Sequence, residues 1–169
     1  MVFYINVLYI SGYAVGQKHA HGGVISNLGG PANMLCLPNN PQLSSRIVPG
    51  GSYIYGTKYE DNTFSSDAYD REVPCSVCRR VNSTASLMIP GRTSCYSGWN
   101  KEYQGIVASD LYSNKPSNYI CVDSHPEYIT EGQTSQDDRL LYATGTKCGS
   151  LPCPPYHDNS ELYCVVCTK

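Results

Sequence analysis

The sequence predicts a mostly β, disulfide-rich fold in which two pseudo-symmetric tandem repeats of short strands share one compact domain. Three observations predict it: a cysteine framework occurs twice, turn-forming residues interrupt short apolar runs, and few windows show helical periodicity. Cysteine accounts for 9 of the 169 residues, whereas Phe is scarce (2) and Trp single. A core with so few large aromatic residues other than tyrosine depends on crosslinks, which form in oxidising compartments.

The predicted strands are short, β-branched or aromatic runs bounded by Gly, Pro, Asn and Ser. The first is as apolar as a signal-peptide core, but no basic residue precedes it and Tyr4, Asn6 and Tyr9 interrupt it, so we interpret it as a strand of the mature fold. The fourth is a Leu-Met-Ile run between the repeats, which we expect to be packed. In order, the strands are expected at 2–10, 33–37, 53–55, 87–89, 119–122, 140–142 and 162–166.

The repeats are visible as matching strings. Residues 31–36 return at 116–121, and the Cys-x-x-Cys motif at 75–78 returns at 164–167. On this alignment Cys95 of repeat 2 matches the first residue of the chain, which is not a cysteine. Repeat 1 therefore lacks one cysteine, and this explains why the total of nine is odd. The missing cysteine would lie at or just before the point where the chain begins. We therefore expect repeat 1 at 1–80, a packed linker at 81–90 and repeat 2 at 91–169.

Shorter strings extend the match. Gly-Thr-Lys occurs at 56–58 and again at 145–147, and Tyr9 matches Tyr103. Repeat 2 alone has Cys148 and Cys153, which align with Tyr59 and Phe64. An aromatic pair in one half is thus expected where the other half has a disulfide.

The two Cys-x-x-Cys motifs admit three interpretations: a four-thiolate zinc site, a redox pair, or structural disulfides. The motifs lie 86 residues apart, whereas zinc ribbons space theirs by roughly 15–20 residues. On a strand, positions i and i+3 point to opposite faces, which favours disulfides to two different strands.

The remaining cysteines are assigned by repeat. In repeat 2, four cysteines would form two bridges in an order that the sequence leaves open, with Cys148–Cys153 as a third. In repeat 1, one thiol remains, either free or bonded to another chain. The two sets are Cys95, Cys121, Cys164 and Cys167 in repeat 2, and Cys36, Cys75 and Cys78 in repeat 1.

The formal charge of −2 gives no electrostatic reason to expect nucleic acid or an anionic membrane as a partner. No run approaches the roughly 20 apolar residues that a membrane helix needs. The cysteine content indicates an extracellular, secreted protein whose signal peptide has been removed. Asn82-Ser83-Thr84 is a glycosylation sequon near the junction of the repeats, which suits that compartment.

Several strings together resemble a known group of proteins. They are Cys-Leu-Pro at 36–38, Val-Pro-Cys-Ser-Val-Cys at 73–78, and the longer strings at 87–99, 148–156 and 164–169. These residues resemble the non-collagenous C-terminal region of the short-chain, spongin-like collagens of sponges and other marine invertebrates, which some sponge lectins also resemble. The resemblance covers essentially the whole chain and implies a secreted matrix or carbohydrate-binding module.

The chain departs from that family in three respects. It has no Gly-X-Y tract, which excludes a collagen triple helix for this sequence. The family's Gly-Arg-Thr-x-Cys string is absent from the start of repeat 1. The family's His-x-x-His-Lys-Gly-like string is reduced to residues 18–23 in repeat 1 and to 111–115 in repeat 2.

Four candidate sites follow from the residues. His19 and His21 alternate and could chelate a metal, or form an exposed polar surface. Asp123, His125 and Glu127 surround Pro126 and could bind calcium or sugar hydroxyls, with no other cofactor expected; a solvated turn explains them equally well. Tyr156, His157, Asp158 and Asn159 combine an aromatic face with polar groups, as sugar sites do, but Asp-Asn also favours a turn. Asn82 is the candidate glycosylation site.

No catalytic constellation is present in the sequence, so we expect no enzyme activity. The first functional hypothesis is a secreted, lectin-like module that binds glycans or matrix glycoproteins and gains avidity from its two repeats or from an oligomer. The alternative is a matrix or fibre subunit that assembles through tyrosine-rich surfaces and the leftover cysteine.

Overall fold

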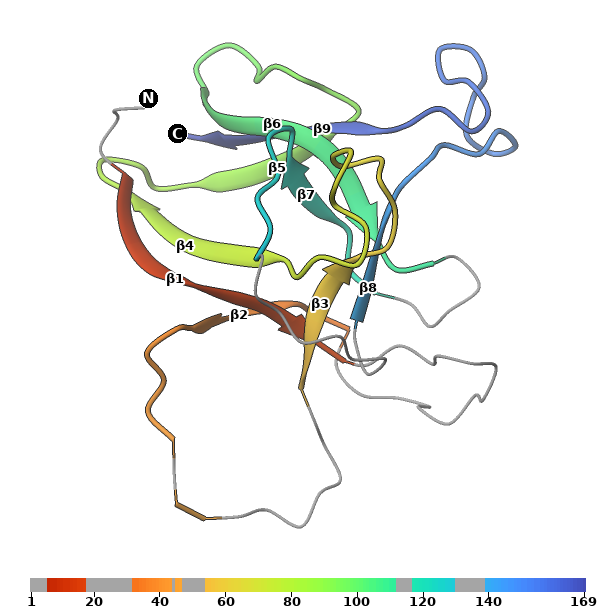
Figure 1. Cartoon of the computed structure of the whole chain (residues 1–169). Helices are drawn as coiled ribbons and strands as arrows, with labels where there is room; N and C mark the ends of the chain where they lie inside the picture. Colours follow the sequence, from red (N-terminus) through yellow and green to blue (C-terminus); the bar gives the residue numbers. More distant parts are fainter. Residues whose placement is uncertain (1–5, 18–31, 44, 47–53, 112–116, 130–138) are drawn as a thin grey trace.

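The structure is a computed structural model that describes residues 6–17, 32–43, 45–46, 54–111, 117–129 and 139–169, with the backbone alone for 6–10. Within these residues the chain is all strand, with no helix, and forms a curled sheet closed by four disulfides (Figure 1). The predicted mostly β, disulfide-rich class is confirmed. The strands are β1 (Asn6–Gly16), β2 (Leu35–Pro38), β3 (Tyr55–Tyr59), β4 (Pro74–Arg80), β5 (Ser86–Pro90), β6 (Asn100–Ser109), β7 (Ile120–Asp123), β8 (Arg139–Ala143) and β9 (Tyr163–Thr168).

Two long strands organise the sheet. β1 pairs antiparallel with β2, β3 and β4, and β6 pairs antiparallel with β7, β8 and β9. β3 and β8 then pair in parallel, from Thr57↔Arg139 to Tyr59↔Leu141, and this contact joins the two strand groups. β5 adds to β9 on the edge that faces away from β6.

The sheet folds sharply at two glycines. Gly12 of β1 pairs with β2 on one edge and with Cys75 of β4 on the other, so β2 and β4 flank β1. Strands two places apart are normally separated by about 9.5 Å, yet the Cα atoms of Cys36 and Cys75 are 5.7 Å apart in a disulfide. β2 must therefore bend over β1, and a Cβ on Gly12 would lie 1.7 Å from the Leu37 carbonyl oxygen.

β6 has the same arrangement. Gly105 pairs with β7 on one edge and with Cys164 of β9 on the other, and the Cα atoms of the Cys121–Cys164 disulfide are 5.9 Å apart. A Cβ on Gly105 would lie 1.7 Å from the Val122 carbonyl oxygen. At both positions the close approach of two backbones requires glycine.

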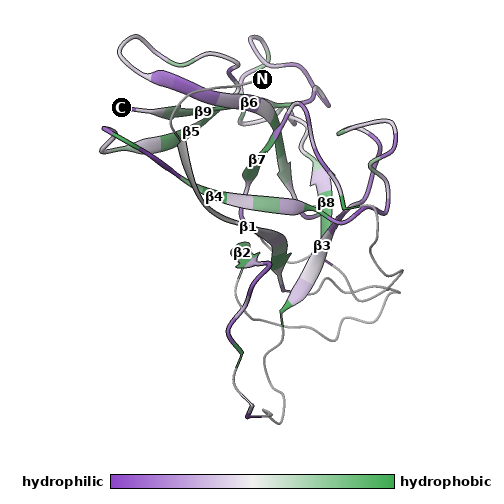
Figure 2. Ribbon diagram, turned by 60° about the vertical axis from the view of Figure 1, so that its left-hand side comes forward, coloured by the Kyte–Doolittle hydropathy of each residue, from purple (hydrophilic) through white to green (hydrophobic). Residues whose placement is uncertain are grey.

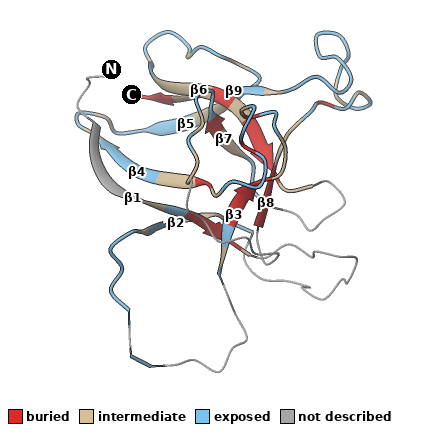
Figure 3. Cartoon of the chain, in the orientation of Figure 1, coloured by how far each residue is buried: buried red, intermediate tan, exposed pale blue. Residues whose placement is uncertain are grey.

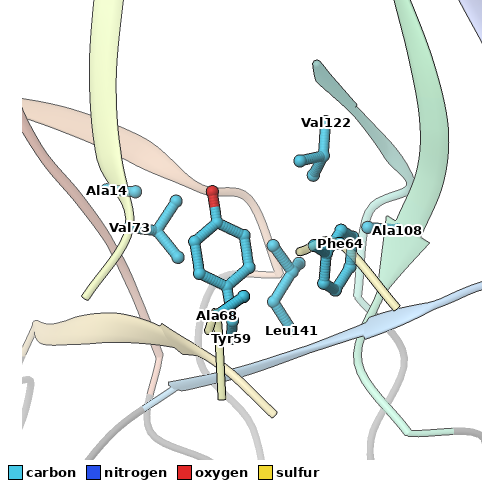
Figure 4. Close-up of a cluster of buried hydrophobic side chains, with 8 residues drawn as sticks. All are labelled: Ala14, Tyr59, Phe64, Ala68, Val73, Ala108, Val122 and Leu141. Carbon is cyan, nitrogen blue, oxygen red and sulfur yellow. The ribbon is translucent and has the colours of Figure 1, made fainter. Parts of the chain in front are cut away.

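The apolar core lies between the two strand groups, where β3 meets β8 (Figures 3 and 4). Leu141 of β8 is 1 % exposed and Tyr59 of β3 is 3 % exposed. The Tyr59 ring packs on Phe64 with 5.1 Å between ring centroids. The buried cluster draws on both halves of the sequence, and its members are Ala14, Tyr59, Phe64, Ala68, Val73, Ala108, Val122 and Leu141.

The disulfides predicted for the second half of the chain agree with the structure. Cys148–Cys153 forms, and the four-cysteine group of the second half forms two bridges, Cys95–Cys167 and Cys121–Cys164. The neighbours Cys164 and Cys167 thus reach different segments, as strand alternation requires. In the first half Cys36 bonds Cys75, and Cys78 is left as an exposed free thiol.

Two strands were missed by the sequence analysis. β4 contains the Cys-x-x-Cys motif and two arginines, and its exposed side chains give it no clear apolar alternation. β6 begins with hydrophilic residues (Figure 2), of which Asn100 and Lys101 are exposed. It ends in the buried Val107, Ala108 and Ser109, so neither strand alternation nor a single apolar run marks it. The predicted strand at 2–10 ends too early, because the described strand continues to Gly16 and pairs with β4 from Asn6 to Tyr13. Residues 2–5 of that prediction lie outside the described residues.

The region expected to be a packed linker contains β5, whose residues Ser86–Pro90 pair with β9. The tandem repeat itself stays a prediction. The two groups of strands pair in a similar pattern, but the matching Gly-Thr-Lys strings do not coincide: 56–58 lie inside β3, whereas 145–147 follow β8.

Candidate functional site

A cleft of about 610 Å³ opens between the two strand groups. Its walls come from β1, β2, β3 and β4 on one side, and from β6, β7 and residues 125–127 on the other. Much of the lining is apolar and includes Met34, Ile120 and the Cys36–Cys75 disulfide. A concave, mainly apolar surface with a few polar groups is the usual character of a small-ligand site.

Two tyrosines line the cleft, and their hydroxyl groups are held by backbone carbonyls. The Tyr59 hydroxyl donates to the Glu127 carbonyl oxygen at 3.1 Å, and the Tyr103 hydroxyl donates to the Cys121 carbonyl oxygen at 3.1 Å. Burial, with smaller contributions from Glu127 and Asp123, raises the pKa of Tyr59 to about 12. Burial also raises the pKa of Tyr103, so both phenols stay neutral at physiological pH.

The polar groups of the cleft come from the turn that follows β7. Asp123, His125 and Glu127, which the sequence singled out as a candidate ligand-binding cluster, all line the cleft. The Asp123 carboxylate accepts a hydrogen bond from the His125 backbone N–H at 2.9 Å, and this bond fixes the turn. The His125 ring lies 3.7 Å from that carboxylate and 3.3 Å from the Ser124 hydroxyl. The exposed imidazole and the carboxylates are therefore accessible to a ligand.

The cleft also contains a group that the sequence analysis did not connect with it. The free thiol Cys78 and its neighbour Ser76, both on β4, line the same cleft as Asp123. The cysteine count predicted one leftover thiol among Cys36, Cys75 and Cys78 without saying which, and the structure identifies it as Cys78. Because β4 was not recognised as a strand, no sequence signal placed it opposite the turn after β7.

The second predicted cluster lies elsewhere and is used within its own loop. The Asp158 carboxylate accepts hydrogen bonds from Lys147 Nζ at 2.7 Å and from the Cys148 backbone N–H at 2.9 Å. These two contacts lower the pKa of Asp158. Asn159 has φ 58°, and its backbone N–H donates to the Thr146 carbonyl oxygen at 2.8 Å. Asp158 and Asn159 thus form hydrogen bonds that hold the exposed Cys148–Cys153 loop. This arrangement fits the alternative that these two residues form a turn.

Tyr156 and His157 complete that second cluster, and both are exposed. The His157 carbonyl oxygen accepts a hydrogen bond from the Thr146 hydroxyl at 2.6 Å. The two side chains remain on the surface, away from the cleft lining.

The other candidate residues are placed as follows. Asn82 is exposed in the turn between β4 and β5, with φ 61°. His19 and His21 lie outside the described residues. Among the residues that the structure describes, no three His, Cys, Asp or Glu side chains are grouped so as to hold a metal ion. Within that same part of the chain, no helix long and apolar enough to cross a membrane is found.

No protein-family model matches this chain. No solved structure matches it either.

Proposed function

We propose that the chain is a non-catalytic, lectin-like module that binds carbohydrate in the cleft between the two strand groups. The observation that carries the proposal is that Asp123, His125 and Glu127 line a cleft whose other walls are largely apolar. A sugar ring has apolar C–H faces and a rim of hydroxyl groups, and carboxylates and imidazole are acceptors and donors suited to those hydroxyls. The combination matches an amphipathic ligand of this kind.

The proposed setting is outside the cell. Four disulfides in a chain of 169 residues fit an oxidising compartment. The resemblance to the non-collagenous region of spongin-like collagens and to sponge lectins supports secretion, and glycans or matrix glycoproteins are the proposed partners. A single site of this kind binds a sugar weakly, so useful avidity requires several sites presented by an oligomer.

Glycan-array binding and haemagglutination test this function. Glu127→Gln and Asp123→Asn keep the shape of the side chains and remove their charges, and Asn at 123 retains an oxygen acceptor for the His125 amide. We expect each variant to weaken glycan binding about tenfold, a loss of about 1.4 kcal/mol. Glu161→Gln is the matched control, because Glu161 is exposed and outside the cleft lining. Silence of the native protein across a broad array, or equal binding by all three variants, would contradict the proposal.

A second candidate function is a matrix or fibre subunit, and the exposure of tyrosine favours it. Large exposed tyrosines recur over several strands and loops, and aromatic residues of this kind are enriched in protein interfaces. They are Tyr13, Tyr69, Tyr96, Tyr119, Tyr156 and Tyr163. Filaments that appear above a threshold protein concentration would support this function, and a monomer at every concentration would contradict it.

A further inference from the structure

β4 and β9 hold equivalent places in their strand groups. The Val73 carbonyl oxygen, just before β4, accepts a hydrogen bond from the Ala14 N–H at 3.0 Å. The Leu162 carbonyl oxygen, just before β9, accepts one from the Val107 N–H at 2.8 Å. Two residues after these carbonyls come Cys75 opposite Gly12 and Cys164 opposite Gly105. β4 therefore lies on β1 in the register that β9 has on β6.

The outer edge of β9 is covered. The Tyr163 carbonyl oxygen accepts from the Gly91 N–H at 2.7 Å, and Lys169 and Ala85 exchange two backbone hydrogen bonds, each of 3.1 Å. Because bonding alternates along an antiparallel strand, Val165 and Cys167 also face β5. After β5 the chain turns back, and Cys95 bonds Cys167. The cover of this edge is therefore a strand followed by a turn and a cysteine.

The outer edge of β4 has no such cover among the described residues. The same alternation directs the backbone N–H and C=O groups of Ser76 and Cys78 away from β1. Cys78, the counterpart of Cys167, is exposed and unbonded, and Val77 beside it is 44 % exposed. An open edge of this kind is a template for another strand.

We propose that the outer edge of β4 is a docking site for an extended, cysteine-bearing polypeptide strand from outside these 169 residues, joined to Cys78 by a disulfide. The pattern of the occupant is that of residues 86–95: an apolar strand, a turn and a cysteine. The other eight cysteines of the sequence are all in disulfides, so the chain itself has no sulfur to offer.

The covalent step is thiol–disulfide exchange. Cys78 loses its proton to buffer, and the thiolate attacks the cysteine sulfur of the strand, which arrives as a mixed disulfide with a small thiol. A new S–S bond forms, the old one breaks, and the small thiol leaves with the electron pair. The mixed disulfide is the oxidant, and the docked strand speeds the step by raising the local concentration of the sulfur atom.

A synthetic peptide tests the proposal on the full chain. It copies residues 86–95, and its cysteine is activated as a mixed disulfide with thionitrobenzoate, whose release is coloured. We expect the peptide to react with Cys78 about tenfold faster than glutathione activated in the same way, a difference of about 1.4 kcal/mol. Mass spectrometry identifies the modified cysteine, and Cys78→Ser abolishes the colour.

Methylated peptides separate strand pairing from simple thiol reactivity. Leu87 and Ile89 lie opposite Cys167 and Val165, the residues of β9 that face β5, so their amides make the backbone bonds. N-methylation at these two positions should lower the rate to that of glutathione, whereas N-methylation at Met88, which points the other way, should leave it high.

Three outcomes would overturn the proposal. They are equal rates for the peptide and glutathione, no effect of methylation at Leu87 and Ile89, and formation of a Cys78-linked dimer faster than peptide capture, which would show that a second copy covers the edge. Glycan binding is measured separately on the Cys78→Ser variant, so failure of one proposal does not decide the other.

Discussion

At Gly105 the absence of a side chain lets β7 bend over β6. A Cβ there would lie 1.7 Å from the backbone oxygen of Val122, which cannot move independently of the strand. We expect Gly105→Ala to lower the free energy of unfolding by about 3 kcal/mol, measured by chemical denaturation. Gly56→Ala is the control, because nothing lies within 4 Å of its Cβ position, and it should stay within about 0.5 kcal/mol. Equal effects of the two substitutions would contradict the sharp fold at Gly105.

Tyr59 links the core to the cleft through its hydroxyl group. Its folded pKa of about 12 exceeds the ordinary value of 10.0, so its contribution to stability is present below pH 10 and is lost as the pH rises towards 12. Tyr59→Phe removes the bond to the Glu127 carbonyl and should cost about 1 kcal/mol at neutral pH. It should also make the alkaline loss of stability shallower, although not flat, because Tyr142 has a pKa raised to about 12 as well.

The measurement for Tyr59→Phe is denaturation at a series of pH values from 7 to 12. Tyr163→Phe, an exposed hydroxyl on β9, is the control and should leave the neutral-pH stability unchanged. An alkaline profile of Tyr59→Phe identical to that of the native protein would rule out the role assigned to this hydroxyl.

The Cys148–Cys153 loop is held by the carboxylate of Asp158. Hydrogen bonds from Lys147 and the Cys148 amide lower the pKa of Asp158 from its ordinary 3.8. Its contribution to the loop is therefore present above pH 3.8 and is lost as the pH falls through the lower folded value. We expect the Cys148 amide resonance to shift in that acid range, and Asp158→Asn to remove the shift. A Cys148 amide that titrates identically in both proteins would contradict the contact.

The parallel pairing of β3 with β8 holds the two strand groups together. Leu141 of β8 is 1 % exposed in the core, so Leu141→Ala should cost about 2–5 kcal/mol, whereas Leu43→Ala, at a residue 85 % exposed, should cost less than about 0.5 kcal/mol. Because one core serves both groups, calorimetry should show a single unfolding transition in the native protein and in Leu141→Ala. Two separate transitions would contradict the shared core.

The elements that the sequence predicted are those with a local signal. β5, β7, β8 and β9 hold short apolar or β-branched runs, and the expected ranges overlap them. β4 and β6 lack such a signal because neither has an alternating apolar face. They are strands because they pair with β1 and with β9. β1 continues through Ser11 and Gly12, which break an apolar pattern, and Gly12 is required where β2 bends over β1.

At the scale of the whole molecule, the cysteine pattern carried the most information. It predicted the pair Cys148–Cys153 and two bridges of open order within the other four cysteines of the second half. It also left one of the three cysteines of the first half over, and the structure selects Cys78. It could not predict the cleft, because the cleft depends on how β4 and the turn after β7 approach each other across the fold. The sequence did single out Asp123, His125 and Glu127, since three polar side chains around a proline mark an exposed turn.

The tandem repeat remains a prediction, and two sets of aligned residues bear on it differently. The disulfides Cys36–Cys75 and Cys121–Cys164 sit at matching positions, and both bridge across a strand at a glycine. The aligned pairs Tyr59–Phe64 and Cys148–Cys153 are each in contact, but the first lies in the core and the second in an exposed loop. These positions therefore align in sequence but do not occupy equivalent places in the structure.

Disulfide mapping tests the central claim most directly, namely that four crosslinks hold an all-strand fold and leave a single thiol beside the cleft. The unreduced, unfolded protein is alkylated, digested and analysed by mass spectrometry. We predict one alkylated cysteine, Cys78, and four crosslinked peptide pairs, which join Cys36 to Cys75, Cys95 to Cys167, Cys121 to Cys164 and Cys148 to Cys153. Alkylation spread over several cysteines, or zinc present in stoichiometric amount, would contradict the account.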